Sequence, residues 1–196
     1  MRAVWRARAG IVTVALIYFV AVASGAIMVH SGSTFALSWR DRIVSRAQSS
    51  AILKHYRNDQ PINAALLDFS ANLFLGGVSS TIVGKWVTAA PYPIAFYRGW
   101  IGGIVSVDGH HRSRLAEPKQ AAYFLLVLIL QLIPYSLAAG AGVNIGRART
   151  HPAIYYQGTK WWGIPIEALR DTLRIYVLVV PLFFVASLWE FLSSWN

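Results

Sequence analysis

Ionisable and amide side chains occur inside long apolar stretches of this sequence, where burial in lipid is costly and function is the usual reason for them. Asp68 and Asn72 are four residues apart and share one face of a helix, which Gly76 and Ser79 continue. Arg98, in the next apolar stretch, is the nearest cation in sequence that lies inside such a stretch. The pattern predicts either a proton or substrate relay, or a direct Asp68–Arg98 ion pair that ties two segments together. The ion pair is the more ordinary interpretation.

Three more polar positions complete the set of intramembrane candidates: Gln131, Asn144 and Glu190. Gln131, Tyr135 and Asn144 give one apolar stretch a polar stripe beside several glycines, which is more typical of helix packing than of a pore. Glu190 lies close to the end of the sequence, with Ser187 on the same helical face. We interpret it as an interfacial carboxylate whose side chain reaches the headgroup region.

The sequence predicts no enzyme, no metal site and no cofactor. Asp108, His110 and His111 are neighbours, but adjacent histidines rarely point at one ion. Cysteine is absent, which excludes disulfides and thiolate chemistry. The Gly140–Gly146 run lacks dinucleotide-binding spacing, and Ser79 has no histidine base in a later apolar stretch. No catalytic residue is therefore assigned.

The elements that position these residues are five long apolar stretches in 196 residues, of which 56% are hydrophobic. A helix needs about 20 apolar residues to cross a bilayer, and the first and fourth stretches reach that length without any charge. We predict an all-α, polytopic membrane helical bundle with four or five transmembrane helices plus an interfacial amphipathic helix. The stretches are Ala9–Val29, Ile62–Gly84, Trp86–Val107, Gln120–Gly146 and Ile175–Trp195.

The third stretch is the ambiguous one. Pro91, Pro93, Arg98 and the pair Gly102-Gly103 interrupt it, so it is either a full crossing or a re-entrant segment. The loop that follows the fourth stretch is basic, and a short interfacial helix is expected to begin there at Ile166.

We divide the chain into an N-terminal transmembrane helix (1–30), a basic interfacial segment (31–60) and a membrane bundle core (61–196). The first span imitates a secretory signal, with Ala21-Val22-Ala23 as a cleavage site, but its apolar run continues to Val29 and predicts an uncleaved span. In the second part, Trp39, Ile43 and their neighbours recur at helical spacing. They predict an amphipathic helix over Trp39–Arg57, with Arg40 among its charged residues, either in the membrane interface or packed over the bundle's end.

The net charge of +10 indicates contact with anionic lipid headgroups, not with nucleic acid, because basic residues flank the apolar stretches. Counted on the two sides of the membrane, the basic residues are nearly equal, so the positive-inside rule leaves orientation open and the N-terminal arginines favour N-inside only slightly. Tryptophans near the predicted span ends suit interfacial positions: Trp39, Trp86, Trp100, Trp161, Trp162 and Trp195.

Four patterns follow one another between Pro61 and Leu192: Asn72 with Gly76-Gly77, Arg98–Gly103 after a proline, the small-residue run Ala138–Gly146, and Leu188–Phe191. In this order they resemble the stage II sporulation protein M family of bacterial and archaeal inner-membrane proteins. One departure matters: family members often carry His-Gly and Glu before the small-residue run, where this chain has Gln131–Tyr135.

The resemblance implies a multi-pass protein of a bacterial or archaeal inner membrane that acts as a scaffold for partner proteins. The family's namesake looks like a membrane scaffold for peptidoglycan-degrading partners. We therefore expect an assembly protein that holds other membrane or envelope proteins, envelope-remodelling factors among them, with a homo-oligomer left open. The alternative is a permease subunit that works with a separate ATPase and passes substrate through the region of Asp68, Asn72 and Gln131.

Overall fold

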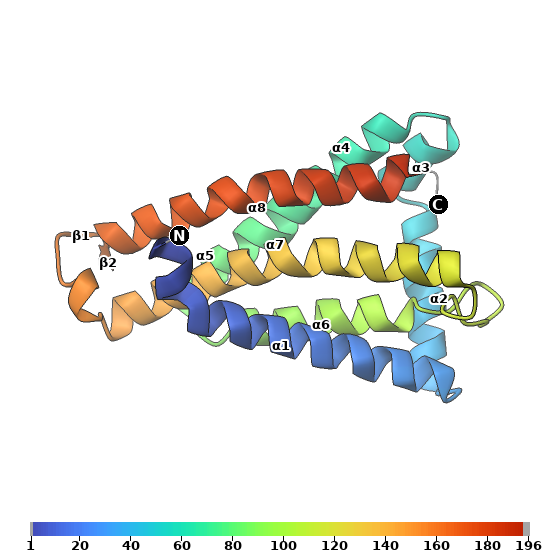
Figure 1. Cartoon of the computed structure of the whole chain (residues 1–196), viewed down its shortest axis with the longest axis horizontal. Coiled ribbons are helices and arrows are strands. Elements are labelled where there is room, and N and C mark those ends of the chain that lie inside the picture. Colours follow the sequence, from blue (N-terminus) through green and yellow to red (C-terminus); the bar gives the residue numbers. More distant parts are fainter. Residues whose placement is uncertain (1, 194–196) are drawn as a thin grey trace.

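The computed structural model describes residues 2–193, except the side chain of Tyr155, and is largely helical (Figure 1). Four of its helical runs are long and apolar enough to cross a membrane, which confirms the prediction of an all-α chain with several membrane-length helices. They are α1 (Arg2–His30), the continuous run of α4 (Pro61–Ala71), η1 (Asn72–Val78) and α5 (Ser79–Trp86), α7 (Pro118–Thr150), and α8 (Ile166–Leu192).

The third predicted stretch forms only a short helix, α6 (Pro91–Ile104). Its 14 residues extend about 21 Å, against about 30 Å for a bilayer core. It begins at Pro91 because a proline in the first turn lacks only an N–H that has no helical partner there. α6 runs parallel to α1 at very short range: a Cβ on Gly99 would lie 3.0 Å from that of Ala21.

The long helices run along the length of the molecule, α4 and α5 obliquely to the others (Figure 1). α5 ends beside the end of α7, where Arg149 donates a hydrogen bond to the Lys85 carbonyl at 3.3 Å. From α5, α4 and α6 diverge toward opposite edges of the view. The main core cluster lies where α8 meets α7 and includes the fully buried Phe183.

The crossing of α5 and α7 depends on the absence of side chains. A Cβ on Gly142 would lie 2.8 Å from the Ser80 carbonyl oxygen and 2.8 Å from Thr81 Cα. There is thus no room for a Cβ at Gly142, and its absence lets the two backbones approach closely. Close backbone packing of this kind is how helices associate in lipid without a hydrophobic driving force. The small-residue run of the sequence is therefore a packing surface.

The basic segment folds as two helices, α2 (Thr34–Gln48) and α3 (Ala51–Arg57), instead of one. The break falls at Ser49-Ser50 because the Ser50 hydroxyl accepts a hydrogen bond from Leu53 N and so caps α3. α2 lies across one end of the bundle (Figure 1), and its apolar face packs on Trp100 and Ile104 of α6.

Arg40 corrects the prediction that α2 presents it as a charged surface residue. It is 4% exposed, and its Nη1 donates to Asp41 at 2.8 Å. Ala36 and Arg40 are one turn apart on the face of α2 that meets the bundle, so the bundle covers both side chains. The hydrogen bond from Arg40, with another from His111, holds the pKa of Asp41 below its usual value.

At the other end of the bundle lie η2 (Ile154–Tyr156) and a hairpin of β1 (Lys160–Trp161) and β2 (Ile164–Pro165). Its turn residues Trp162 and Gly163 have φ of 51° and 74°, as a two-residue hairpin requires. A helix begins at Ile166 as expected, but the expectation that it is short and separate is wrong, since α8 continues to Leu192. Within its first turns, Glu167 forms ion pairs with Arg170 and with Arg174.

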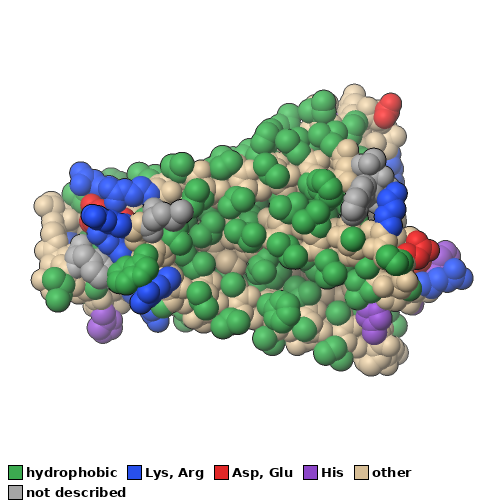
Figure 2. Space-filling model, viewed as in Figure 1, with side chains coloured by type: hydrophobic (Ala, Val, Ile, Leu, Met, Phe, Trp, Pro, Cys, Tyr) green, Lys and Arg blue, Asp and Glu red, His purple; other side chains and the backbone are tan. Residues whose placement is uncertain are grey.

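Apolar side chains cover the middle of the bundle, while charged side chains gather at its two ends (Figure 2). Trp86, Trp161 and Trp162 are exposed, as expected of interfacial aromatics. Trp100 is not, because it is 8% exposed under Phe35 and Trp39 of α2. Trp195 lies outside the described residues.

Candidate functional site

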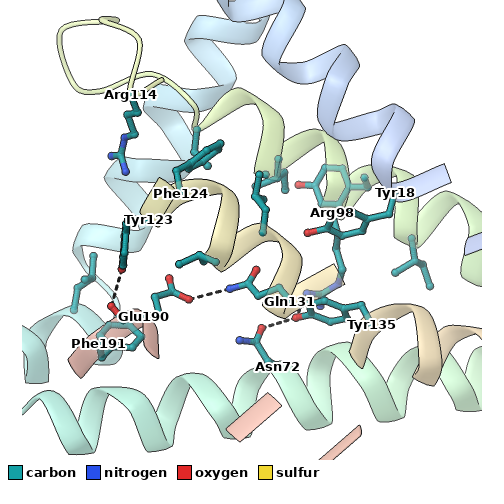
Figure 3. Close-up of a pocket in the computed structure, with 18 of the residues that line it drawn as sticks. Tyr18, Asn72, Arg98, Arg114, Tyr123, Phe124, Gln131, Tyr135, Glu190 and Phe191 are labelled. Atoms are coloured by element: carbon teal, nitrogen blue, oxygen red, sulfur yellow. Dashed lines mark hydrogen bonds between the residues drawn. The ribbon is translucent and has the colours of Figure 1, made fainter. Parts of the chain in front are cut away.

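A cavity of about 890 Å³ lies among α6, α7, the end of α8, η1 and α3; we call it the central cavity. Its volume falls within the range of small-molecule sites, about 300 to 1,000 Å³. Figure 3 shows polar groups from separate helices converging on it, among apolar and aromatic side chains. Tyr18 of α1 and Arg114, in the loop before α7, also line it.

Asp68 and Asn72 lie together on the side of α4 and η1 that meets α7 and α8. Asp68 Oδ2 accepts hydrogen bonds from Asn72 Nδ2 at 2.8 Å and from the Ser187 hydroxyl at 2.7 Å. Asn72 Oδ1 accepts one from the Tyr135 hydroxyl (Figure 3). Three helical segments are thus joined through polar side chains.

Arg98 reaches the same group from α6. Its Nη1 donates to the Tyr135 hydroxyl at 2.6 Å and its Nη2 to the Leu75 carbonyl at 3.2 Å. The guanidinium also lies over the Tyr135 ring, 4.6 Å from its centre. We call Asp68, Asn72, Arg98, Tyr135 and Ser187 the central network.

The predicted direct pair of Asp68 with Arg98 is not formed among the residues that the structure describes. Tyr135 of α7 stands between them, accepting from Arg98 and donating to Asn72, which in turn donates to Asp68. The cation and the carboxylate are therefore linked through two neutral side chains. Sequence separation alone gave no signal of this, because the intervening tyrosine comes from another helix.

Glu190 lies near the end of α8 and lines the central cavity. Its Oε2 accepts a hydrogen bond from Gln131 Nε2 at 2.9 Å, so these two candidates meet (Figure 3). α3 covers the end of α8: the rings of Tyr56 and Phe191 pack edge to face at 5.6 Å. Tyr123 donates to the Glu190 carbonyl at 2.7 Å and fixes the end of α8 against α7.

A π-helical segment, η1, interrupts the second apolar helix beside the cavity. Such segments are rare and are frequent at functional sites. Within η1, the Leu75 carbonyl accepts from the Ser79 hydroxyl at 2.6 Å as well as from Arg98. Sequence reasoning assigned no role to this carbonyl, since periodicity does not distinguish a π-helix from an α-helix.

Asn144 lies apart from the other candidates, toward the opposite end of the bundle. Its Nδ2 donates to the Tyr156 hydroxyl at 2.7 Å, and that hydroxyl donates to Asp171 Oδ2 at 3.0 Å. Asp171 is 0% exposed and pairs with Arg6 at 3.0 Å and with Arg174 at 2.9 Å. Sequence reasoning did not single out Asp171; its i, i+3 spacing from Arg174 was the available signal.

The metal candidates Asp108, His110 and His111 make contacts of other kinds. In the part of the chain that is described, no three His, Cys, Asp or Glu side chains are close enough together to hold a metal ion. Asp108 instead accepts hydrogen bonds from the backbone N–H groups of His110 and Arg112, which lower its pKa. His111 points to Asp41, at 3.1 Å.

Comparison with known protein families, with curated proteins and with solved structures finds no match to this chain. The resemblance to the stage II sporulation protein M family stays a prediction.

Proposed function

We propose that this chain is a multi-pass integral protein of the cell membrane that binds a ligand in the central cavity, as the membrane-embedded subunit of a permease does. The observation that carries the proposal is the cavity itself: about 890 Å³, at the depth of membrane-length helices, with amide, hydroxyl and charged groups converging on it. Polar groups at such depth usually mark a substrate path. A separate partner would supply any ATPase activity.

The apolar and polar parts of the lining support a ligand of small-molecule size. Phe124, Val127 and Leu128 contribute apolar wall from α7, while Gln131 and Arg98 contribute hydrogen-bond donors. Largely apolar walls with a few convergent polar groups are the common composition of ligand sites. A protein that acted only through its outer surface would gain nothing from this interior.

Filling the cavity tests the proposal. Val127→Trp adds an indole to the cavity wall, whereas Val177→Trp makes the same change on α8 at a side chain that is 72% exposed. The readout is the phenotype of a deletion of this gene in its native host, complemented by each variant at matched expression. We expect Val127→Trp to fail and Val177→Trp to complement. Full complementation by both variants would contradict the proposal.

The second candidate is the scaffold that the sequence resemblance predicts. One observation favours it: the central network joins α4, η1, α6, α7 and α8, so its polar groups act as interhelical links. Asp68→Asn separates a link from a proton carrier. Both hydrogen bonds to Asp68 reach one oxygen, which the asparagine carbonyl can replace, so a scaffold keeps its partners and its activity. A proton-coupled permease loses activity with its fold and complexes intact.

A further inference from the structure

We infer that the ligand of the central cavity is an amphiphile with an anionic head, and that Arg98 is the residue that pairs with that head. The inference rests on the proposed function, because it names the ligand class of the same cavity. Its basis is a cation on the wall of the central cavity whose hydrogen-bond partners, among the described residues, are neutral.

Arg98 has no carboxylate within ion-pair distance among the described residues. Its two hydrogen bonds go to a tyrosine hydroxyl and a backbone carbonyl, and neither carries a charge. Asp68, the acid of the central network, is separated from it by Asn72 and Tyr135. A cation inside a membrane bundle is costly unless an anion accompanies it, so the missing anion is most simply supplied by the ligand.

The guanidinium retains donors for that anion. Arginine carries five N–H groups in a planar fork, and two of its nitrogens make the hydrogen bonds just described. The Tyr135 ring beneath and the Leu75 carbonyl hold the fork in one orientation. A carboxylate or phosphate accepts two parallel hydrogen bonds from such a fork, which makes arginine the usual partner of these groups.

The remaining lining suits an apolar chain attached to the anion. Arg114 lies at the loop end of the cavity and Arg98 at the α6 side (Figure 3). Phe124 and the hydrogen-bonded Glu190 and Gln131 also line the cavity. Val127 and Leu128 extend the apolar wall. A long acyl or alkyl chain therefore finds apolar contact while its head remains at Arg98.

The test uses the full chain in nanodiscs of zwitterionic lipid and three photoreactive probes. Each probe carries the same diazirine-bearing dodecyl chain, and the heads are phosphate, hydroxyl and trimethylammonium. Cross-linked peptides are identified by mass spectrometry, with unlabelled probe as competitor. We expect competable labelling of α6 and α7 wall residues by the phosphate probe, at least about tenfold above the other two. Inorganic phosphate should not compete, since it lacks the chain.

Arg98→Gln should reduce labelling by the phosphate probe about tenfold and leave labelling by the hydroxyl probe unchanged. Arg46→Gln is the matched control, since it removes the same charge from an exposed position on α2. Arg98→Lys keeps the charge but loses the fork, and should retain intermediate labelling. If Arg98→Gln does not fold, the head selectivity of the unaltered chain still decides.

The outcomes separate this inference from the proposed function. Equal labelling of the cavity by all three probes would overturn the anionic head while leaving a ligand cavity in place. Absence of competable labelling by any probe would overturn both. Phosphate-selective labelling that persists in Arg98→Gln would assign the anion to another residue and overturn the role of Arg98.

Discussion

The Tyr135 hydroxyl lies between Arg98 Nη1, from which it accepts a hydrogen bond at 2.6 Å, and Asn72, to which it donates one. One side chain of α7 therefore connects α6 with η1. This contact decides how the intramembrane charges of the chain are arranged, because it replaces a direct ion pair with a relay of neutral groups.

Tyr135→Phe should destabilise the protein by about 1–3 kcal/mol, because it removes one hydroxyl and leaves two partly buried polar partners, Arg98 and Asn72, without it. Thermal unfolding in a mild detergent measures the loss. Tyr92→Phe on α6 is the control, since no hydrogen bond of its hydroxyl is found among the described residues, and it should change stability little. Equal effects of the two variants would contradict the bridging role.

Double-mutant cycles should rank the contacts of Arg98. The pair Arg98→Ala and Tyr135→Phe should show a coupling energy of about 1 kcal/mol or more, because the two side chains touch. The pair Arg98→Ala and Asp68→Ala should show a smaller coupling, since two side chains separate them. A larger coupling energy for the second pair would contradict this arrangement and support the direct ion pair that the sequence predicts.

Gly142→Ala should destabilise the crossing of α5 and α7 by about 1–3 kcal/mol, because the added methyl meets backbone atoms at 2.8 Å. Gly158→Ala is the matched control, since nothing lies within 4 Å of a Cβ at that position. Unfolding in detergent again gives the comparison. A stable Gly142→Ala protein would mean that the two helices do not cross as described.

Asp171→Ala should cost about 3 kcal/mol, because it leaves Arg6 and Tyr156 without their buried partner. Glu167→Ala, at the exposed side of the same cluster, should cost clearly less, since water replaces its partial contacts with Arg170 and Arg174. Resistance of α8 to proteolysis near residue 171 should fall in the first variant and not in the second. A larger loss of stability in Glu167→Ala than in Asp171→Ala would contradict the central role of the buried carboxylate.

Length and hydropathy were enough to predict the long apolar helices, since these depend on properties that a single stretch carries by itself. The short α6 was ambiguous because its prolines and glycines are compatible with either a crossing or a half-length helix. The break at Ser49-Ser50 had a signal in the capping serine, although the amphipathic stripe concealed it.

The candidate site was only partly predictable. Five candidates were found because they are polar residues inside apolar stretches. Four of them line the central cavity, namely Asn72, Arg98, Gln131 and Glu190, and the fifth, Asp68, is hydrogen-bonded to Asn72. Tyr135 and Ser187 were noted only for the faces that they share with Gln131 and Glu190. Their contacts with the other candidates were not predicted, because they come from helices far away in sequence. Burial of Asp171 and Arg40 depends on which neighbours cover them, and a single helix does not contain that information.

The most direct test of the central claim measures access to the central cavity from water. The chain contains no cysteine, so a single introduced thiol reports alone. Leu128→Cys places it on the cavity wall, and Ile129→Cys places it one residue along α7 at a side chain that is 51% exposed in the apolar belt. In native membranes, a small anionic methanethiosulfonate should modify the thiol at position 128 at least about tenfold faster than that at position 129. Equal and negligible modification of both would contradict a solvent-connected cavity.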